Sequence, residues 1–312
     1  KGLSEAAIKT ATMQVPELEP GHVLLRVDRF ALNQMALGYL QKGFTRSFAA
    51  YHSFFPCQEE GHFRSGCWGT ATVVESDHPK VAIGTRLYGL LPPCRYTLQR
   101  VGCILPARKG GQPLQVELAM ENVPFNLRRF QEFETIANTG SDPLVDEDWD
   151  LVMRERYTCA FYMDEQLLVD VGMVNCAIIS CASSKTALAL AHCLRMREMR
   201  NIIGMTSKEH LDFVRSTELF TEVFPYEDVG MLPNTRTVVY VDMRCDGELL
   251  RAVSSRMGTH LMYSMTVGPA VFQKTLKDQS VEVRGRRVNF DESSWRERRR
   301  MVAQVTKTGR DE

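Results

Sequence analysis

The chain has 312 residues, of which 44% are hydrophobic and 24% charged, and its 38 basic side chains equal its 38 acidic ones. This is the balance of an ordinary globular protein, and a chain without net charge has no overall field that would draw it to nucleic acid or to an acidic membrane. No apolar run reaches the length of about 20 residues that a membrane-spanning helix needs.

The residue pattern of the first 110 residues is typical of β-structure. Strands are predicted over Gly21–Phe30, Gly66–Glu75 and Val81–Leu91, which are rich in β-branched and aromatic residues and are separated by turn residues. Glycines inside the second stretch allow bends. Short strands at this spacing predict a small, strongly bent barrel over residues 1–110.

The strand pattern ends before residues 111–150, where Pro113, Pro124 and Pro143 interrupt any long periodic pattern. We interpret this range as an irregular insertion or lid, with a short helix over Asn126–Phe133. Helical spacing of apolar residues returns from Asp148.

Strands and helices alternate from Asn175 onward. The expected strands are Cys176–Ser180, Asn201–Met205, Glu222–Phe224, Thr237–Asp242 and His260–Val267, and the expected helices are Ser184–Arg197, Lys208–Ser216 and Gly247–Arg256. Short connections between such elements predict a doubly wound parallel sheet. The remaining residues, 271–312, are interpreted as a segment that returns to the barrel domain or as a tail; Arg296, Arg298, Arg299 and Arg300 there suit a solvated helix face.

The turn after the first strand of this sheet has an unusual composition. Dinucleotide-binding proteins place glycines here, so that the backbone approaches a pyrophosphate above a helix N-terminus. This chain has Ser180-Cys-Ala-Ser-Ser-Lys-Thr-Ala187 instead. The hydroxyl and ammonium groups that could bind phosphate belong to Ser183, Ser184, Lys185 and Thr186. A capped helix without any ligand explains the same residues equally well.

Hydroxyls and a cation also follow the second strand of the sheet. An acidic residue at this position would bind the ribose 2′-hydroxyl of NAD. The chain has Thr206, Ser207 and Lys208, which suit a 2′-phosphate, so NADP(H) is the favoured cofactor. The alternative is a second helix cap followed by a surface lysine.

Two further positions are candidates for cofactor contacts. Asp242 ends the strand Thr237–Asp242, where it could contact a ribose or cap the next helix. Ser264 lies in the stretch Tyr263–Gly268 at the end of the last strand, a plausible surrounding for a nicotinamide.

The cysteines indicate neither a disulfide framework nor a metal site. Nine cysteines are spread over the chain, mostly among apolar residues, and no C-x-x-C pair occurs. They suit reduced thiols in an intracellular compartment, with cytoplasm and mitochondrion both open.

With these residues in place, the chain resembles the DUF2855 family, remote quinone-oxidoreductase-like members of the medium-chain dehydrogenase/reductase superfamily. The matching stretches include Trp68–Ser76, Gly84–Gly89, Ser183–Leu188, Gly204–Ser207 and Tyr240–Met243, in order along the chain. The resemblance implies a GroES-like β-barrel domain over residues 1–110 and a Rossmann-type nucleotide-binding domain over residues 151–270.

The superfamily transfers a hydride from NADPH to a quinone, an enone or a carbonyl compound. Its zinc enzymes carry a cysteine soon after the first strand, where this chain has Leu32-Asn-Gln-Met35, and Phe63 follows His62 where those enzymes have a glutamate. The resemblance therefore implies chemistry without zinc or another metal. Tyr39 and Tyr51 lie in the region that faces the cleft in related proteins and are the candidate proton donors.

Two functions from different classes follow. The first is a zinc-independent, NADP(H)-dependent oxidoreductase that acts on a small carbonyl or quinone-like compound. The second is a catalytically inactive, dehydrogenase-like accessory or scaffold subunit of a larger complex, mitochondrial or not, with or without a structural nucleotide. A nucleotide sensor differs from it only in having a reversible ligand. A homo-oligomer is compatible with either.

Overall fold

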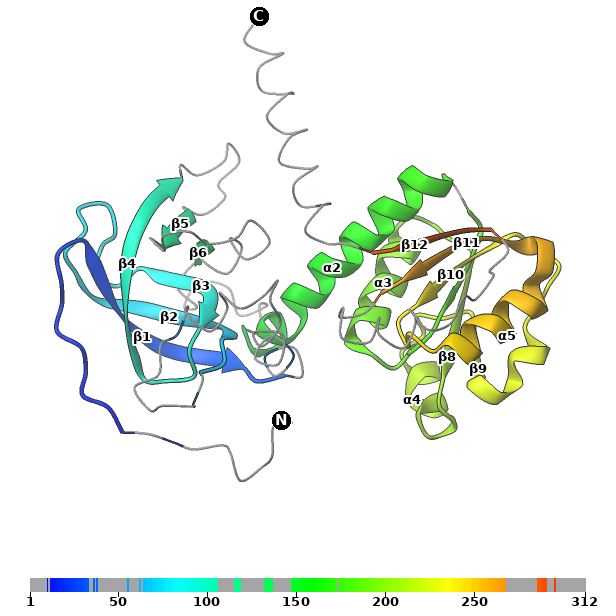
Figure 1. Cartoon of the computed structure of the whole chain (residues 1–312), viewed down its shortest axis with the longest axis horizontal. Coiled ribbons are helices and arrows are strands. Elements are labelled where there is room, and N and C mark those ends of the chain that lie inside the picture. The colour runs from blue at the N-terminus through cyan, green and yellow to red at the C-terminus, as the bar shows by residue number, and fades with distance from the viewer. Residues whose placement is uncertain are drawn as a thin grey trace, which may run out of the picture. The chain divides into compact units, whose positions relative to one another are not determined.

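The computed structural model describes residues 12–33, 64–105, 115–118, 132–136, 147–172, 174–267 and 285–290, together with the single residues 10, 36, 38, 55, 62 and 295. The chain divides into two compact units, Lys1–Leu151 and Val152–Glu312. Figure 1 shows an antiparallel barrel in the first unit and a parallel sheet with helices in the second.

The first unit contains a closed barrel. Its strands are β1 (His22–Ala31), β2 (Cys67–Ser76), β3 (Arg86–Leu91), β4 (Tyr96–Leu105), β5 (Gln115–Leu118) and β6 (Glu132–Ile136). They follow one another around the barrel in the order β1-β2-β3-β6-β5-β4, and β1 closes the ring by pairing antiparallel with β4. The register of β1 with β2 shifts twice, and such irregularities bend a strand enough for a small barrel to close.

Alternate residues of these strands fill the barrel. Leu25, Val73, Leu87 and Phe133 each expose 1% or less of their surface, and they belong to one hydrophobic cluster. Gly89 makes room for the largest of them, because a Cβ there would lie 2.5 Å from the Phe133 ring. Packing inside the barrel therefore requires a glycine at position 89.

The barrel is more complete than the sequence pattern indicated. Strands β4, β5 and β6 were not predicted, and β5 and β6 lie in the range 111–150 that was interpreted as irregular. Glu132 and Phe133, assigned to the end of a short helix, belong to β6; the rest of that predicted helix lies outside the described residues. Strands β5 and β6 are only 4 and 5 residues long, too short for a clear alternating pattern.

The second unit is a six-stranded parallel sheet. Its strands are β7 (Cys176–Ile179), β8 (Asn201–Thr206), β9 (Glu222–Pro225), β10 (Val238–Asp242), β11 (Leu261–Thr266) and β12 (Arg286–Asn289). The order across the sheet is β12-β11-β10-β7-β8-β9, so the chain starts in the centre, builds one half outward and then returns for the other. This is the Rossmann order, and the predicted fold class is confirmed.

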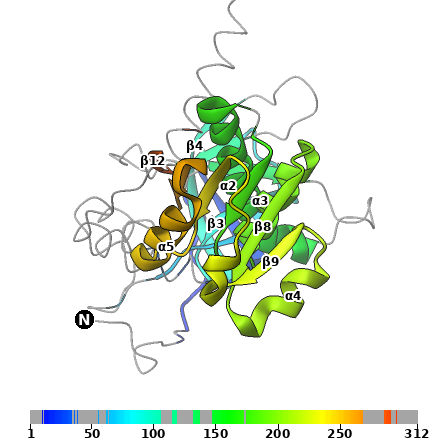
Figure 2. The ribbon, with the colours of Figure 1, turned by 90° about the vertical axis from the view of Figure 1, so that its right-hand side faces the viewer.

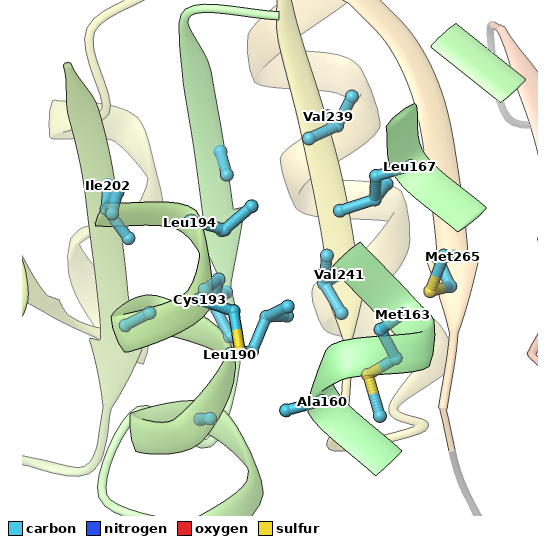
Figure 3. Packing of buried hydrophobic residues seen from close by; sticks show 14 of the residues in the cluster. Ala160, Met163, Leu167, Leu190, Cys193, Leu194, Ile202, Val239, Val241 and Met265 are labelled. Atoms are coloured by element: carbon cyan, nitrogen blue, oxygen red, sulfur yellow. The ribbon is translucent and has the colours of Figure 1, made fainter. Parts of the chain in front are cut away.

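Helices cover both faces of this sheet, as Figure 2 shows. The long helix α2 (Glu147–Val171) and helix α3 (Lys185–Met196) pack on one face, where Met163, Leu167 and Leu190 meet Val239 and Val241 (Figure 3). Helix α5 (Gly247–Met257) and the 3-10 segment η5 (Tyr226–Met231) pack on the other face. Because both faces are covered, each central strand is buried along its whole length.

The remaining short helices connect strands of the same sheet. They are η4 (Lys208–His210), α4 (Leu211–Ser216) and η6 (Gly258–His260). Strand β12 was not predicted, and it places part of the range 271–312 beside β11 of the parallel sheet rather than in the barrel. The predicted arginine-rich helix face after Ser294 lies outside the described residues apart from Trp295. Among the helices that the structure describes, none combines the length and apolar character needed to cross a membrane.

Candidate functional site

The candidate site lies where the strand order of the parallel sheet reverses, between β7 and β10. These two strands pair in parallel, and the chain leaves their carboxyl ends in opposite directions across the sheet, toward β8 from one and toward β11 from the other. The crevice outside the strands at such a switch point is where open α/β sheets bind ligands. The turns that follow β7, β8 and β10 therefore supply the side chains that a ligand would meet.

The turn from β7 into α3 is closed by hydroxyl and backbone groups. Ser184 is the N-cap of α3, and its Oγ accepts a hydrogen bond of 3.2 Å from the Ala187 N–H. Cys181 adopts a positive φ of 51°, a conformation that costs a non-glycine residue about 1–2 kcal/mol. The turn thus takes a shape that glycine usually supports, although it contains no glycine.

Ser183 and Thr206 bring the first two strand ends together. Thr206 Oγ1 lies 3.4 Å from Ser183 Oγ, and the Ala182 N–H donates to the Met205 carbonyl at 3.0 Å. This approach requires Gly204, because a Cβ there would lie 2.9 Å from the Ala182 Cβ. Two of the predicted hydroxyl groups therefore lie side by side at the carboxyl edge.

The lysines of the two turns remain at the surface. Lys185 is the exposed first residue of α3, with Thr186 partly buried beside it, and Lys208 is the exposed first residue of η4. Ser207 Oγ donates to Glu209 Oε1 at 3.2 Å. A 2′-phosphate bound by Ser207 and Lys208 would have to break this hydrogen bond. The exposed Glu209 side chain could then move away from the phosphate into solvent.

Asp242 holds the turn after β10 and is fully buried. Its Oδ1 accepts hydrogen bonds from the backbone N–H of Cys245 at 3.0 Å and of Arg244 at 3.2 Å, and from the Ser180 hydroxyl at 3.3 Å. Burial raises the pKa of Asp242, and these hydrogen bonds act in the opposite direction. Asp242 was also considered as the cap of the next helix, but the N-cap of α5 is Asp246, whose carboxylate accepts hydrogen bonds from Glu248 N and Leu249 N.

Ser264 is not at the edge where the other candidates lie. It pairs with Tyr240 two residues before β11 ends, and its side chain is fully buried. Within the described part of the chain its Oγ has no hydrogen-bond partner, and the same is true of Asp242 Oδ2 and Thr266 Oγ1. In this conformation Ser264 has no surface to offer a cofactor. Tyr39 and Tyr51, the candidate proton donors, lie outside the described residues.

Three residues at the switch point carry contacts that the sequence pattern did not reveal. The Tyr226 hydroxyl accepts a hydrogen bond of 3.2 Å from the Cys181 N–H, and the Arg244 guanidinium lies 4.2 Å from the centre of the Tyr226 ring. They come from the turns after β7, β9 and β10. The one available signal was position, since Tyr226 and Arg244 each follow a strand end. Burial raises the pKa of the Cys181 thiol, which makes it a poor nucleophile at neutral pH.

The donor set at this edge fits a phosphorylated nucleotide. The Ser183 hydroxyl lies 3.4 Å from that of the buried Thr206, and Lys185 and Lys208 are the exposed first residues of α3 and η4, which follow these two turns. Such groups bind phosphate oxygens, and no carboxylate ends β8 to select a free ribose 2′-hydroxyl. Within the ranges that the structure describes, His, Cys, Asp and Glu side chains form no group of three that could hold a metal ion.

Solved structures with the same two-unit fold include reductases. CurA from Vibrio vulnificus, solved in complex with NADPH, is 15% identical with a TM-score of 0.59, over 96% of this chain and 82% of CurA. A putative NADPH:quinone reductase from Mesorhizobium loti is 13% identical with a TM-score of 0.57, over 95% and 78% of the two chains. CurK enoyl reductase is 12% identical with a TM-score of 0.54, over 97% and 83%. At this identity the likeness establishes the fold.

The barrel and the Rossmann-type sheet together define a protein with the medium-chain dehydrogenase/reductase fold. More specifically, residues 30–310 match the family described as "Protein of unknown function (DUF2855)", and the chain belongs to that family. The sequence has no significant match among functionally curated proteins.

Proposed function

We propose that this protein is a zinc-independent oxidoreductase that binds NADP(H) at the switch point and reduces a small quinone, enone or carbonyl compound. The observation that carries the proposal is the juxtaposition of Ser183 and Thr206, 3.4 Å apart at neighbouring strand ends, with Lys185 and Lys208 following them. These groups suit the pyrophosphate and a 2′-phosphate. CurA, which shares the fold, was solved with NADPH, and this supports the choice of cofactor.

Under this proposal, some residues bind the cofactor and others donate a proton to the substrate. NADP(H), when bound, supplies the hydride. Ser183, Ser184, Lys185 and Thr186 would hold the pyrophosphate, and Ser207 and Lys208 would hold the 2′-phosphate. Thr206, which exposes only 1% of its surface, would instead keep the Ser183 hydroxyl in place. Asp242 would act indirectly, because its carboxylate fixes the turn after β10 and is itself buried. Tyr39 and Tyr51 stay the proposed proton donors to the substrate.

The test is a calorimetric titration of the full chain with NADPH and with NADH. We expect NADPH to bind at least about tenfold more tightly, and Lys208→Glu to abolish this preference while leaving NADH affinity within about twofold. An unchanged NADPH affinity in Lys208→Glu would remove the 2′-phosphate assignment. If neither dinucleotide binds, the proposal as a whole fails.

One observation favours the accessory-subunit alternative. The Cys181 N–H, in the turn where a pyrophosphate would bind, is already engaged by the Tyr226 hydroxyl. A chain that kept the fold and lost turnover could use such internal contacts to hold the turn without a nucleotide. Under this alternative, the protein purified from its natural source would elute with other chains, and the isolated chain would show no turnover of NADPH with a panel of quinones and enones.

A further inference from the structure

The Arg244 side chain lies on the Tyr226 ring beside the turn after β7, and its contact with Asp246 does not account for this position. We infer that Arg244 is a phosphate-binding residue, whose guanidinium supplies the pyrophosphate of a bound dinucleotide with the charge and donors that the glycine-free turn lacks. The inference rests on the proposed function, and it adds a residue to which neither the sequence pattern nor the family points.

The backbone of Arg244 is held at the switch point itself. Its N–H donates to Ser180 Oγ at 3.1 Å and to Asp242 Oδ1 at 3.2 Å, and these two residues follow or end the two strands between which the order reverses. The Met243 N–H also donates to Ser180 Oγ, at 2.8 Å. The start of the Arg244 side chain is therefore fixed at the carboxyl ends of β7 and β10.

The side chain extends from there toward the turn after β7. Its Cζ lies 4.2 Å from the centre of the Tyr226 ring, and the Tyr226 hydroxyl contacts the Cys181 N–H in that turn. Tyr226 thus acts as a platform that places a guanidinium above the turn. The side chain of Arg244 keeps 42% of its surface exposed, so a ligand bound at this edge of the sheet could reach it.

The contact of Arg244 with Asp246 does not explain this placement. Arg244 Nε donates to Asp246 Oδ2 at 3.0 Å, whereas Asp246 caps α5 through Oδ1, which accepts from Glu248 N and Leu249 N. The cap therefore forms without the arginine. An ion pair with 42% and 31% of its side-chain surfaces exposed contributes little to stability.

The chemistry suits a pyrophosphate in particular. A turn rich in glycine lets several backbone N–H groups approach the phosphates, but here the turn has no glycine and the Cys181 N–H is engaged by Tyr226. A guanidinium offers five donors in one plane and a charge that persists at every accessible pH. Arg244 could bridge oxygens of both phosphates, which a single lysine could not do with the same geometry.

The test compares variants of the full chain by calorimetric titration with NADPH and NADH, which share the pyrophosphate and differ in the 2′-phosphate. We expect Arg244→Gln to weaken both ligands about tenfold, and Arg244→Lys to lose about threefold. Lys208→Gln should weaken NADPH alone. Arg251→Gln, which removes a like charge from the exposed surface of α5, should leave both affinities within about twofold.

Variants of Tyr226 test whether the position of the Arg244 guanidinium matters as well as its charge. Tyr226→Phe keeps the ring under the guanidinium and should retain dinucleotide affinity, whereas Tyr226→Leu removes the platform and should weaken both ligands although Arg244 is intact. Thermal melts identify any variant that fails to fold. If Arg244→Gln does not fold, Arg244→Lys is compared with the natural chain instead.

Three results would overturn the inference. If Arg244→Gln binds both dinucleotides within twofold of the natural chain, Arg244 has no part in binding, while the proposed function stands. If it loses affinity for NADPH alone, its contact is with the 2′-phosphate and the pyrophosphate assignment is wrong. If the natural chain binds neither dinucleotide, the proposed function and the inference fail together.

Discussion

Arg86 Nη2 lies 2.6 Å from Glu147 Oε1, and each of these two side chains exposes only 12% of its surface. The same carboxylate oxygen accepts a hydrogen bond of 2.8 Å from the Thr70 hydroxyl. Glu147 is the first residue of α2, while Arg86 and Thr70 lie on β3 and β2. A largely buried ion pair thus fastens the start of the long helix to the barrel strands.

Removing one member of this pair should destabilise the protein. Glu147→Gln removes the nearer of two carboxylates beside the Arg86 guanidinium, since Asp28 Oδ2 lies 4.0 Å from Arg86 Nε, and we expect the free energy of unfolding to fall by about 2–3 kcal/mol, measured by urea denaturation. Asp148→Asn is the matched control, because Asp148 pairs with Arg29 in an exposed ion pair one residue further along the same helix. Its cost should stay below about 0.5 kcal/mol. Equal losses in the two variants would show that helix position, and not the buried pair, matters.

Ser184→Asp separates the structural role of the turn from its proposed ligand. Aspartate is as good an N-cap as serine, so the hydrogen bond from the Ala187 N–H should persist and stability should change by less than about 0.5 kcal/mol. A bound pyrophosphate would meet a new negative charge, and NADPH affinity should fall about tenfold. Ser184→Ala is the matched comparison: it should lose about 1 kcal/mol of stability, and it should weaken NADPH less than Ser184→Asp does, because it removes one hydroxyl without adding a negative charge. Unchanged NADPH binding in Ser184→Asp would place the pyrophosphate elsewhere.

Glu198 follows α3 with a strained backbone. Its φ is 60°, while its N–H donates to the Arg195 carbonyl at 2.8 Å in the closing turn of the helix. Glu198→Gly should raise the free energy of unfolding by about 0.5–1 kcal/mol, because the relief of left-handed strain exceeds the entropy that glycine adds to the unfolded chain. Glu198→Ala keeps the Cβ and should gain nothing. A melting temperature that falls in the glycine variant would contradict this account.

Stability should fall in alkaline solution through the buried thiols. Burial raises the pKa of Cys176 to about 11 from its ordinary value of 9.0. Between these values the unfolded chain has lost the proton that the folded chain retains, so rising pH favours unfolding. We expect the urea midpoint to fall between pH 9 and pH 11, with a smaller decrease in Cys176→Ala. Identical pH dependence in the two proteins would exclude Cys176 as a contributor.

Local patterns were enough to predict most of the second unit. Strands β7, β8 and β10 are short apolar runs, and helix α3 begins after the recognisable cap Ser184, so each of these elements could be located without knowing its neighbours. Short connections then required a parallel sheet. The hydroxyls and lysines at the strand ends followed directly, because the carboxyl ends of parallel strands share one edge.

Other features depended on pairings between distant segments. Strands β5, β6 and β12 are 4 or 5 residues long and exist only because a neighbouring strand supplies their hydrogen bonds, so their local sequence carries little signal. The burial of Ser264 also depended on its depth in the sheet, two residues from the end of β11, which alternation alone does not specify.

The amino-acid sequence by itself therefore determined the order of strands β7 to β11 with helices α3, α4 and α5 between them, the glycine-free turn and the family, since these depend on residues close together in the chain. Only the tertiary structure decided that the Tyr226 hydroxyl contacts the Cys181 N–H and that Arg244 lies on the Tyr226 ring. Tyr226 is 45 residues from Cys181, and the contact forms because the turns after β7, β9 and β10 converge at one edge of a folded sheet.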